Sequence, residues 1–375
     1  MAKVRSWVGL DVHAAKVIAC VVDAESGEMT VHRMSGETAV VAAFCGALPG
    51  PTRVAYEAGS TGYGLARARR RGSGVWSRRR ARIERPAQDR VKTDQREAER
   101  LVRLLMIDAL HAVRVSTPEE EALRDLVRAR DDLRGDLMRA RHRLSKLLLR
   151  CDVRYGDTTS RWGERHRAWL AHVALSERGA QLTLTEYVGA IEALEIRRAT
   201  LERTIGELIS SSPWAQDVAR LRCLRGFDML SAVGLAVEVG DFGRFEHPKL
   251  LMSYLGLVPS EHSTGDSRRQ GHITKSGSRH ARRLLVEAAW HYRRSPRLGT
   301  TLQRRQDGQQ QAVVAIAWQA QQRLHRIWRR LDGQRGKRRT VVAVAVARQL
   351  AGFCWAIVTY NQDAQPAREL EVSHT

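Results

Sequence analysis

Four carboxylates in this sequence occupy positions from which they could act together. Asp94 and Glu97 lie three residues apart in VKTDQREAERLVRLL (residues 91–105), a stretch whose spacing predicts a basic amphipathic helix with both acids on one face. Asp11 lies inside an apolar strand-like run, where a charge is costly unless it is paired, and Glu57 ends a later run of the same kind. Oxygen-rich clusters of this kind bind Mg²⁺ or Mn²⁺, which would neutralise their mutual repulsion.

The chemistry that such a cluster predicts is attack on a phosphodiester. Two ions roughly 3.5–4 Å apart activate a nucleophile and stabilise the leaving oxygen. A simpler interpretation stays open, in which the two helical acids only pair with basic neighbours on a solvated helix and Asp11 caps a turn. Those neighbours are Arg90, Lys92, Arg96 and Arg100.

The charge balance indicates what the partner is. The chain has 375 residues, with 63 Lys and Arg against 41 Asp and Glu, so its formal net charge is +22. This imbalance favours a polyanion, nucleic acid before an anionic membrane surface. No apolar run is expected to approach the ~20 residues of a spanning helix, and we find no signal peptide. The five scattered cysteines predict a reduced cytoplasmic compartment, without disulfides or a zinc site.

The elements that must position the acids begin with an α/β segment. Residues 4–57 contain three successive strand-like runs, a helical pattern at 36–48 and a further strand, followed by a glycine-rich turn and a helix. This order predicts a ribonuclease-H-like domain over residues 1–115. The four acids would then come from two strands and one helix.

A long helical arm is predicted over residues 116–212. In residues 119–150, leucines recur at spacings of three to four or seven, as in a helical hairpin or coiled coil, and residues 188–209 form a suitable antiparallel partner. The segment 151–187 would link the two helices. Self-association is a common use of such an arm.

The remaining chain predicts a mainly helical C-terminal domain over 213–362 and a disordered tail over 363–375. Residues 221–245 look like two short helices around a glycine turn. Within them, residues 225–241 are similar to a helix-hairpin-helix, whose turn offers N–H groups to a phosphate, although plain helix packing is an equal alternative. A Ser-, Gly- and Arg-rich loop is expected at 260–279, and core helices are expected at 312–318 and 341–358.

Several blocks of the chain resemble one family in the same order. The blocks are WVGLDVHAAK (7–16), AYEAGSTGYGLARA (55–68), DRVKTDQREAERLVRLL (89–105) and YLGLVPSEHSTGDSRRQGHITKSGSRHARRLLVEAAW (254–290). They resemble the two domains of the DEDD transposases of the insertion-sequence-110 family, which are related to Piv-type DNA invertases. The match runs over nearly the whole chain.

The resemblance implies a RuvC-like fold of the ribonuclease-H type, with Mg²⁺ (or Mn²⁺) bound by Asp11, Glu57, Asp94 and Glu97. It also implies a serine nucleophile from the C-terminal domain, which would link covalently to DNA. A serine hydroxyl is a poor nucleophile at neutral pH, so metal polarisation of the phosphate would assist it. The family's members are understood to act on DNA as homo-oligomers, here a dimer or tetramer, guided by a structured RNA from the element.

The sequence departs from the family pattern at both sites. The family's fourth acid is usually Asp, whereas Glu97 stands here and would shift its carboxylate by over an ångström (about one methylene), in a site where Mg²⁺ demands near-ideal geometry. The family's nucleophile directly precedes a glycine, where this chain has Thr264, with Ser263 one residue earlier. Either hydroxyl is a candidate nucleophile, and an ordinary polar turn is the alternative.

A third departure is RRRGSGVWSRRRAR at residues 69–82, where the ribonuclease-H layout calls for a buried apolar strand. One interpretation is a basic loop that grips phosphates. The other, which we favour, is a local frameshift out and back in a GC-rich gene. Reading the parent locus in its other frames would decide between them.

Basic residues near these motifs are the candidates for nucleic-acid contact, with a merely solvated loop as the alternative. They are Arg90, Lys92, Arg96, Arg268, Arg269, Lys275, Arg279, Arg282 and Arg283. Three histidines, His13, His272 and His280, could approach the site. The function that we expect is Mg²⁺-dependent transposition. The alternatives are a catalytically inactive nucleic-acid-binding remnant and, third, a junction-resolving nuclease.

Overall fold

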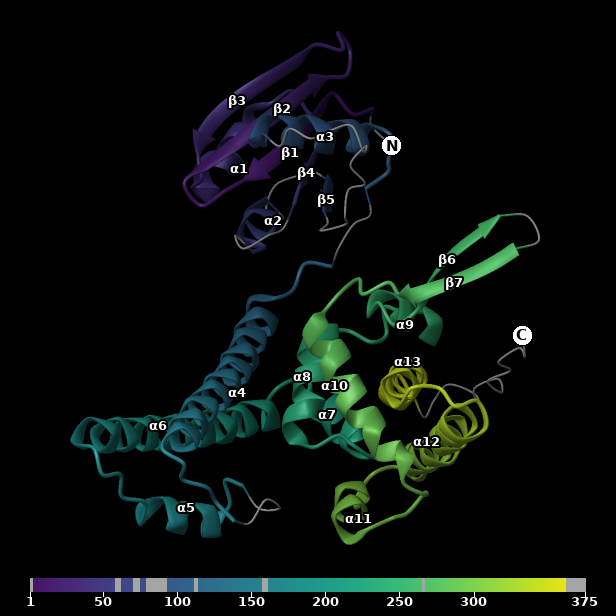
Figure 1. Cartoon of the computed structure of the whole chain (residues 1–375). Coiled ribbons are helices and arrows are strands. Elements are labelled where there is room, and N and C mark those ends of the chain that lie inside the picture. The colour runs from purple at the N-terminus through teal and green to yellow at the C-terminus, as the bar shows by residue number, and fades with distance from the viewer. Residues whose placement is uncertain are drawn as a thin grey trace. The chain divides into compact units, whose positions relative to one another are not determined.

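The computed structural model describes residues 3–57, 62–69, 75–78, 93–110, 114–156, 161–264 and 267–361. The chain divides into two compact units, residues 1–117 and residues 118–375, and each is described by itself (Figure 1). The predicted tail, residues 363–375, lies outside the described residues. The predicted division of the second unit into an arm and a C-terminal domain at residue 212 stays a prediction.

The first unit is built on a five-stranded sheet with the order β3-β2-β1-β4-β5. Strands β1, β2 and β3 follow one another antiparallel, and β4 and β5 then continue the sheet parallel to β1. The predicted order of three strands, a helix and a further strand is therefore confirmed. The strands are β1 (Ser6–Val12), β2 (Lys16–Asp23), β3 (Met29–Ser35), β4 (Thr52–Tyr56) and β5 (Val75–Arg78).

Helices cover both faces of this sheet. Alternate residues of β1 and β4, among them Leu10 and Tyr56, pack with buried residues of α1 (Thr38–Ala47) and α2 (Gly64–Arg69) on one face. On the other face, Ala98 and Val102 of α3 (Asp94–Met106) pack on Trp7 and on residues of β2. Strand residues alternate between faces, so β1 presents Trp7, Gly9 and Asp11 toward the side of α3.

Gly9 sets how closely α3 approaches the sheet. A Cβ atom at this position would lie 2.2 Å from the carbonyl oxygen of Ala98 and 2.6 Å from the backbone nitrogen of Val102. Only a glycine leaves room for the helix backbone at this crossing. This contact fixes the first turn of α3 near the end of β1.

The arginine-rich stretch at 69–82 contains a strand. Residues 75–78 pair in parallel with β4 as β5, with Val54 opposite Trp76, at the edge of the sheet. The reading of these four residues as loop is thus wrong. Edge strands of natural sheets often carry charged side chains, which discourage pairing with another chain. Residues 70–74 and 79–82 lie outside the described residues, and the frameshift hypothesis stays a prediction.

The second unit begins with a long helical hairpin (Figure 1). Helices α4 (Pro118–Arg150) and α6 (Arg178–Ser210) pack against each other in antiparallel directions, since Arg130 pairs with Glu202 and Arg141 pairs with Glu195. The predicted helices are confirmed, but α6 begins ten residues before the predicted 188. Supercoiling of the pair stays a prediction.

The segment predicted to be only a link between these helices carries a helix of its own, α5 (Glu164–Ala171). Leu170 of α5 is buried with Leu144 and Ile191 of the hairpin, and Trp162 and Trp169 pack against the same cluster. The two tryptophans signal this local core because large aromatic side chains contribute most when they are buried.

The C-terminal part of the second unit is helical and surrounds a single large core that also includes Leu123 and Ile205 of the hairpin. The predicted pair of short helices around a glycine turn is confirmed as α7 and α8, with Gly226 at φ +93°. The helices are α7 (Ala215–Arg222), α8 (Met229–Val239), α9 (Pro248–Tyr254), α10 (Arg279–Ala289), α11 (Thr300–Gln306), α12 (Gln311–Arg329) and α13 (Arg339–Val358), with a 3₁₀ turn at Trp290–Arg293.

Part of the loop expected at 260–279 is instead a two-stranded hairpin. Strands β6 (Pro259–Thr264) and β7 (Ser267–Ile273) pair antiparallel, with Thr264 opposite Ser267. Residues 265 and 266, between the two strands, lie outside the described residues. The polar composition concealed the hairpin because neither strand carries an alternating apolar pattern.

Helix α13 corrects the expectation that no apolar run approaches the length of a membrane span. By length and composition alone, its 20 residues could cross a membrane. Its side chains nevertheless fill the C-terminal core, and α13 packs against α9, α10 and α12. The predicted role of residues 341–358 as a core helix is confirmed.

Candidate functional site

The first candidate site lies where the end of β1 meets the first turn of α3. Asp11 of β1, His13 just beyond it and Asp94 of α3 offer ligand atoms that all lie within 4.8 Å of one another. The Nε2 atom of His13 lies 3.2 Å from Oδ2 of Asp11 and 3.7 Å from Oδ1 of Asp94. Two of the four predicted acids are therefore brought together with a histidine.

The other two predicted acids lie close to this group without belonging to it. Leu10 lies opposite Tyr56 in the parallel register of β1 and β4, so Glu57 follows β4 at the level of Asp11. Glu97 lies one turn after Asp94 in α3, and its negative charge acts on Asp11. Both acids are thus at the same end of the sheet as Asp11.

The electrostatics of the group reflect crowded negative charge. Burial raises the pKa of Asp11 above its ordinary value. His13 lowers this pKa, while the negative charges of Glu97 and Asp94 raise it. A carboxylate that is partly buried among others favours a bound cation, because a cation replaces the lost solvation and relieves the repulsion.

Lys16 partly serves as such a cation. Its Nζ lies 2.6 Å from Oδ2 of Asp94, and this hydrogen bond is the main reason why the pKa of Asp94 is lowered. The sequence reading did not single out Lys16. The signal was present, because β2 begins at Lys16 directly after the short turn that follows β1, which returns the lysine to the end of the strand that holds Asp11.

The simpler interpretation of Asp94 was pairing with Arg90, Lys92, Arg96 or Arg100, and it stays open because Arg90 and Lys92 lie outside the described residues. The ion pairs found for Asp94 reach Lys16 and His13, which lie outside α3. A helix-terminal role accounts for part of its placement, since acids in the first turn of a helix interact favourably with the helix dipole. Thr93 already caps this helix by accepting a hydrogen bond from the N–H of Arg96.

The donor set suits a hard divalent cation. Carboxylate oxygens are the ligands of Mg²⁺ and Mn²⁺, and an imidazole nitrogen is compatible with Mn²⁺ more than with Mg²⁺. Asp11 and Asp94 would hold the ion, and Lys16 would compete with the ion for Asp94. The residues present therefore fit a divalent metal ion.

The predicted nucleophiles lie in the second unit. Ser263 and Thr264 are the last two residues of β6, opposite Arg268 and Ser267 of β7. The side chains of residues 262–264 and 267–269 lie outside the described residues, so Ser263 and Thr264 are described by their backbone pairing alone.

The predicted nucleic-acid contacts fall into different surroundings. Arg96 is exposed on α3, Arg268 and Arg269 belong to β7, and Lys275 and Arg279 are exposed between β7 and the start of α10. Arg90 and Lys92 lie outside the described residues. His272, on β7, is exposed as well.

Two of the predicted arginines make structural contacts within the second unit. Arg282 donates through Nη1 to the carbonyl oxygens of Leu255, Ser276 and Gly277, which holds the chain between β7 and α10 against the end of α9. These bonds give the guanidinium a fold-stabilising role that the charge pattern alone does not reveal.

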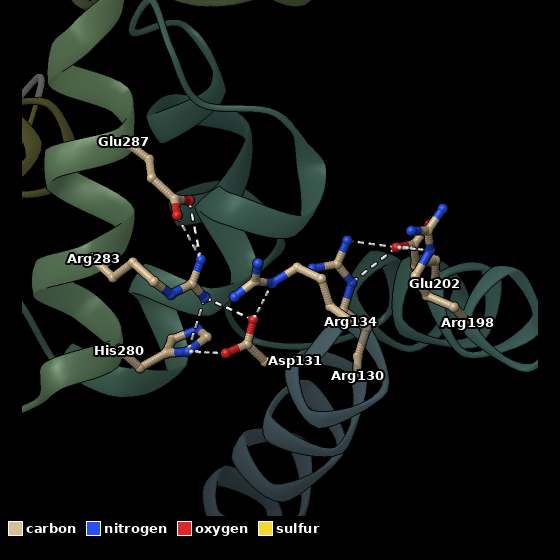
Figure 2. A network of polar contacts seen from close by, with 8 residues as sticks. All are labelled: Arg130, Asp131, Arg134, Arg198, Glu202, His280, Arg283 and Glu287. Carbon is tan, nitrogen blue, oxygen red and sulfur yellow. Dashed lines mark hydrogen bonds and ion pairs between the residues drawn. The ribbon is translucent and has the colours of Figure 1, made fainter. Parts of the chain in front are cut away.

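Arg283 belongs to a network that joins the helical hairpin to α10 (Figure 2). Its Nη2 lies 2.7 Å from Oδ1 of Asp131 in α4, and its Nη1 lies 3.0 Å from Oε1 of Glu287. His280 also contacts Asp131, at 3.5 Å. The pKa of Asp131 is lowered because hydrogen bonding and the charges of Arg134 and Arg283 outweigh the effect of burial.

Comparisons with known proteins agree with both halves of the chain. Residues 8–151 match the profile of the DEDD transposase family (DEDD_Tnp_IS110), and residues 218–303 match that of the transposase IS116/IS110/IS902 family. The first match contains the cluster around Asp11, and the second contains the β6–β7 hairpin.

Relatives cover nearly the whole chain. The protein y4qE of Sinorhizobium fredii, described as a transposase, is 40% identical over 94% of this chain and 88% of its own length. The transposase for insertion sequence element IS1533 of Leptospira borgpetersenii is 32% identical over 89% of this chain and 99% of its own length. The pilin gene-inverting protein of Moraxella bovis is 25% identical over 53% of this chain and 55% of its own length. The chain therefore belongs to the IS116/IS110/IS902 family of transposases, enzymes of DNA transposition.

Proposed function

We propose that this transposase exchanges DNA strands with the help of Mg²⁺ or Mn²⁺ through a covalent link between DNA and a hydroxyl of the β6–β7 hairpin. The observation that carries the proposal is the gathering of Asp11, His13 and Asp94 within 4.8 Å in the family-matched first unit. The strand order β3-β2-β1-β4-β5 supports a ribonuclease-H-like fold of the RuvC type for that unit.

The acids of the first unit have the role of holding the metal. Asp11 and Asp94 would bind it directly, with Glu57 and Glu97 completing the ligand set from β4 and α3. When bound, the ion supplies Lewis-acid polarisation of a phosphodiester oxygen. Without the ion, His13 and Lys16 pair with the carboxylates and offset part of their charge, and Lys16 would compete with the ion for Asp94.

The hydroxyl of Ser263 or Thr264 attacks phosphorus in this scheme. A bond forms between the side-chain oxygen and phosphorus, and the bond from phosphorus to one deoxyribose oxygen breaks. The hydroxyl proton goes to solvent, and the released deoxyribose oxygen takes up a proton. Attack by the deoxyribose hydroxyl of another strand then reverses these steps, so the phosphodiester energy is kept and no nucleotide cofactor is consumed.

The proposal also covers the assembly of several copies of the chain and the binding of a guide RNA. The α4–α6 hairpin exposes large apolar residues, which supports self-association into a dimer or tetramer through this arm. They are Met138, Leu149, Leu182, Ile196 and Leu208. The chain's net charge of +22 supports binding of DNA and of a structured guide RNA from the element, in the cytoplasm.

The first experiment is a strand-exchange assay with the full chain, the element's ends and its flanking non-coding DNA. We expect exchange in Mg²⁺ or Mn²⁺ and none in EDTA. Asp11→Asn should lower exchange by about 100-fold or more, the scale of losing one preorganised electrostatic contact. Asp125→Asn, which removes an exposed carboxylate of α4, is the matched control and should leave the rate unchanged. Equal activity of both variants would contradict the metal site.

The nucleophile is tested by trapping the covalent protein–DNA adduct. Ser263→Ala should abolish the adduct if Ser263 attacks, and Thr264→Ala should abolish it if Thr264 attacks. Cleavage without any adduct would instead be the behaviour of a junction-resolving nuclease. The match of residues 218–303 to a transposase domain gives that alternative no support. Complete inactivity with every guide and end would identify an inactive remnant.

A further inference from the structure

A basic cavity lies in the second unit, at the glycine turn between α7 and α8, in the stretch whose sequence is similar to a phosphate-binding helix-hairpin-helix. It has a volume of about 1000 Å³ and is open to solvent. Its walls are the turn between α7 and α8 and the chain that runs from the 3₁₀ turn after α10 into α11. The elements that form it belong to one compact core, so its shape is set by the fold.

The charge of the lining is strongly positive. Four arginines and His291 line the cavity against a single carboxylate, Asp228. That carboxylate is already engaged, because its Oδ1 accepts the backbone N–H of Ser231 at 2.8 Å and the Ser231 hydroxyl at 2.6 Å in the cap of α8. The arginines are Arg225, Arg294, Arg297 and Arg305.

Two of these arginines are held in place by backbone carbonyls. Nη1 of Arg225 donates to the carbonyl oxygen of Ser295 at 2.8 Å, and Nη1 of Arg305 donates to that of Phe227 at 2.6 Å. These bonds tie the two walls of the cavity together. A guanidinium carries five N–H donors, so each arginine keeps donors beyond those that anchor it.

The other two arginines have no such anchor. Arg294 and Arg297 are exposed, and neither side chain makes a hydrogen bond or ion pair with the described residues. A solvated surface charge is the ordinary explanation of one such residue. Here, however, the two side chains face a cavity whose partly buried arginines already repel further positive charge.

Burial and the positive charge around the cavity lower the pKa values of two groups that line it, His291 and Arg225. Burial lowers the pKa of His291, and the charges of Arg225, Arg294 and Arg305 lower it further. The pKa of Arg225 is also lowered, first by burial and then by Arg294. Cations gathered in this way are mutually destabilising unless an anion joins them.

A glycine fixes the wall that carries Arg225. Gly226 has a φ of +93°, and a Cβ atom there would lie 2.7 Å from the carbonyl oxygen of Ala288 in α10. The turn between α7 and α8 is therefore pressed against α10 and leaves Arg225 little freedom. A preorganised donor binds an anion with a smaller entropy loss than a flexible one.

A second basic cavity adjoins the first and shares Pro296 with it. Its volume is about 860 Å³, and its lining includes Arg293, Arg326, Arg329 and Arg330. Positive charge thus continues across the short segment 293–297, from one cavity to the next. A continuous basic track of this kind fits a polymer of phosphates better than an isolated phosphate ion.

We propose that the cavity at the α7–α8 turn binds the phosphodiester backbone of nucleic acid, with Arg294 and Arg297 as its adaptable contacts and Arg225 and Arg305 as its fixed ones. This site needs no metal and no carboxylate of the first unit. It holds the nucleic acid on the helical core of the second unit. Because the contacts reach phosphate groups alone, binding at this site does not depend on the base sequence.

The test is the affinity of the full chain for labelled nucleic acids, measured by fluorescence anisotropy in EDTA over a series of salt concentrations. The double variant Arg294→Gln and Arg297→Gln should bind about tenfold more weakly and lose roughly two units of the salt slope, one for each phosphate contact. Arg143→Gln with Arg150→Gln, two exposed arginines of α4, is the charge-matched control and should stay within about twofold of the unmodified chain.

Two nucleic acids are compared in order to identify whether DNA or RNA supplies the phosphate groups. A duplex DNA and an RNA hairpin of equal charge are compared, and the larger loss of affinity identifies the natural ligand. If the double variant loses no more affinity than the control for either nucleic acid, the proposal is wrong. Asp11→Asn should bind like the unmodified chain in this assay while failing in strand exchange, which separates failure of this site from failure of the metal site.

Discussion

At the scale of single residues, Lys16 controls how much negative charge the candidate metal site presents. Its ammonium group lies on Asp94, while His13 lies between Asp94 and Asp11. A divalent ion bound by both carboxylates would compete with Lys16 for Asp94, because the Nζ of Lys16 lies on Oδ2 of this carboxylate. The lysine therefore competes with the metal and stabilises the cluster without it.

Lys16→Gln should lower the Mg²⁺ concentration that gives half-maximal strand exchange. We expect a shift of about two- to fivefold, because Lys16 is largely exposed and such ion pairs are weak. Lys146→Gln, an exposed lysine of α4, removes the same charge elsewhere and should leave the Mg²⁺ requirement unchanged. A higher Mg²⁺ requirement in the Lys16 variant would show that this lysine assists metal binding instead of opposing it.

Asp11 and Asp94 were predicted from residue types alone. A carboxylate inside an apolar strand is costly unless it is paired, and Asp94 lies one helical turn from a second acid, Glu97. Residue types did not predict Lys16, whose relevance depends on the short turn that returns β2 beside β1. They also did not predict the ion pair of Arg283, whose partner Asp131 is 152 residues away in sequence. Ion pairs between distant elements leave no local pattern.

At the scale of elements, the crossing of β1 and α3 brings the acids together. Gly9 is in contact with the backbone of α3 at Ala98 and Val102, and Asp11 follows two residues later on the same face. The first turn of the helix, with Asp94, is placed by this contact. The metal site therefore depends on a residue that bears no functional group.

Gly9→Ala should displace α3 and weaken the site. The added Cβ would lie 2.2 Å from a carbonyl oxygen, so the helix must move, at a cost of about 1–3 kcal/mol in the free energy of unfolding. Urea denaturation measures this cost, and Mn²⁺ titration of the folded variant should show weaker binding. Gly46→Ala, in α1 with open space around its Cβ, is the control. Unchanged Mn²⁺ affinity in a destabilised Gly9 variant would separate the helix crossing from the metal site.

The elements themselves were largely predictable where one face is apolar. The first three strands, α3 and the long helix α4 have the spacing expected of half-buried strands and amphipathic helices. The β6–β7 hairpin was not predicted, because its strands are polar. Backbone hydrogen bonds pair them, and such bonds leave no pattern of residue types in the sequence. The four-residue strand β5 was missed for a similar reason, since backbone pairing with β4 defines it as a strand.

At the scale of the whole molecule, the two candidate chemistries lie in separate compact units. The carboxylates belong to residues 1–117, whereas Ser263, Thr264 and the basic cavities belong to residues 118–375. Strand exchange by the proposed route requires both units at one phosphate, from one copy of the chain or from two. The net charge of +22 predicted the polyanionic partner, but the sequence did not indicate which arginines stand free of internal contacts.

The most direct test of the account is an anomalous difference map from crystals of the full chain grown with Mn²⁺. The account predicts a manganese peak coordinated by Asp11 and Asp94, with Glu57 or Glu97 nearby and with Lys16 moved away from Asp94. Manganese bound only elsewhere, with Lys16 still paired to Asp94, would contradict it.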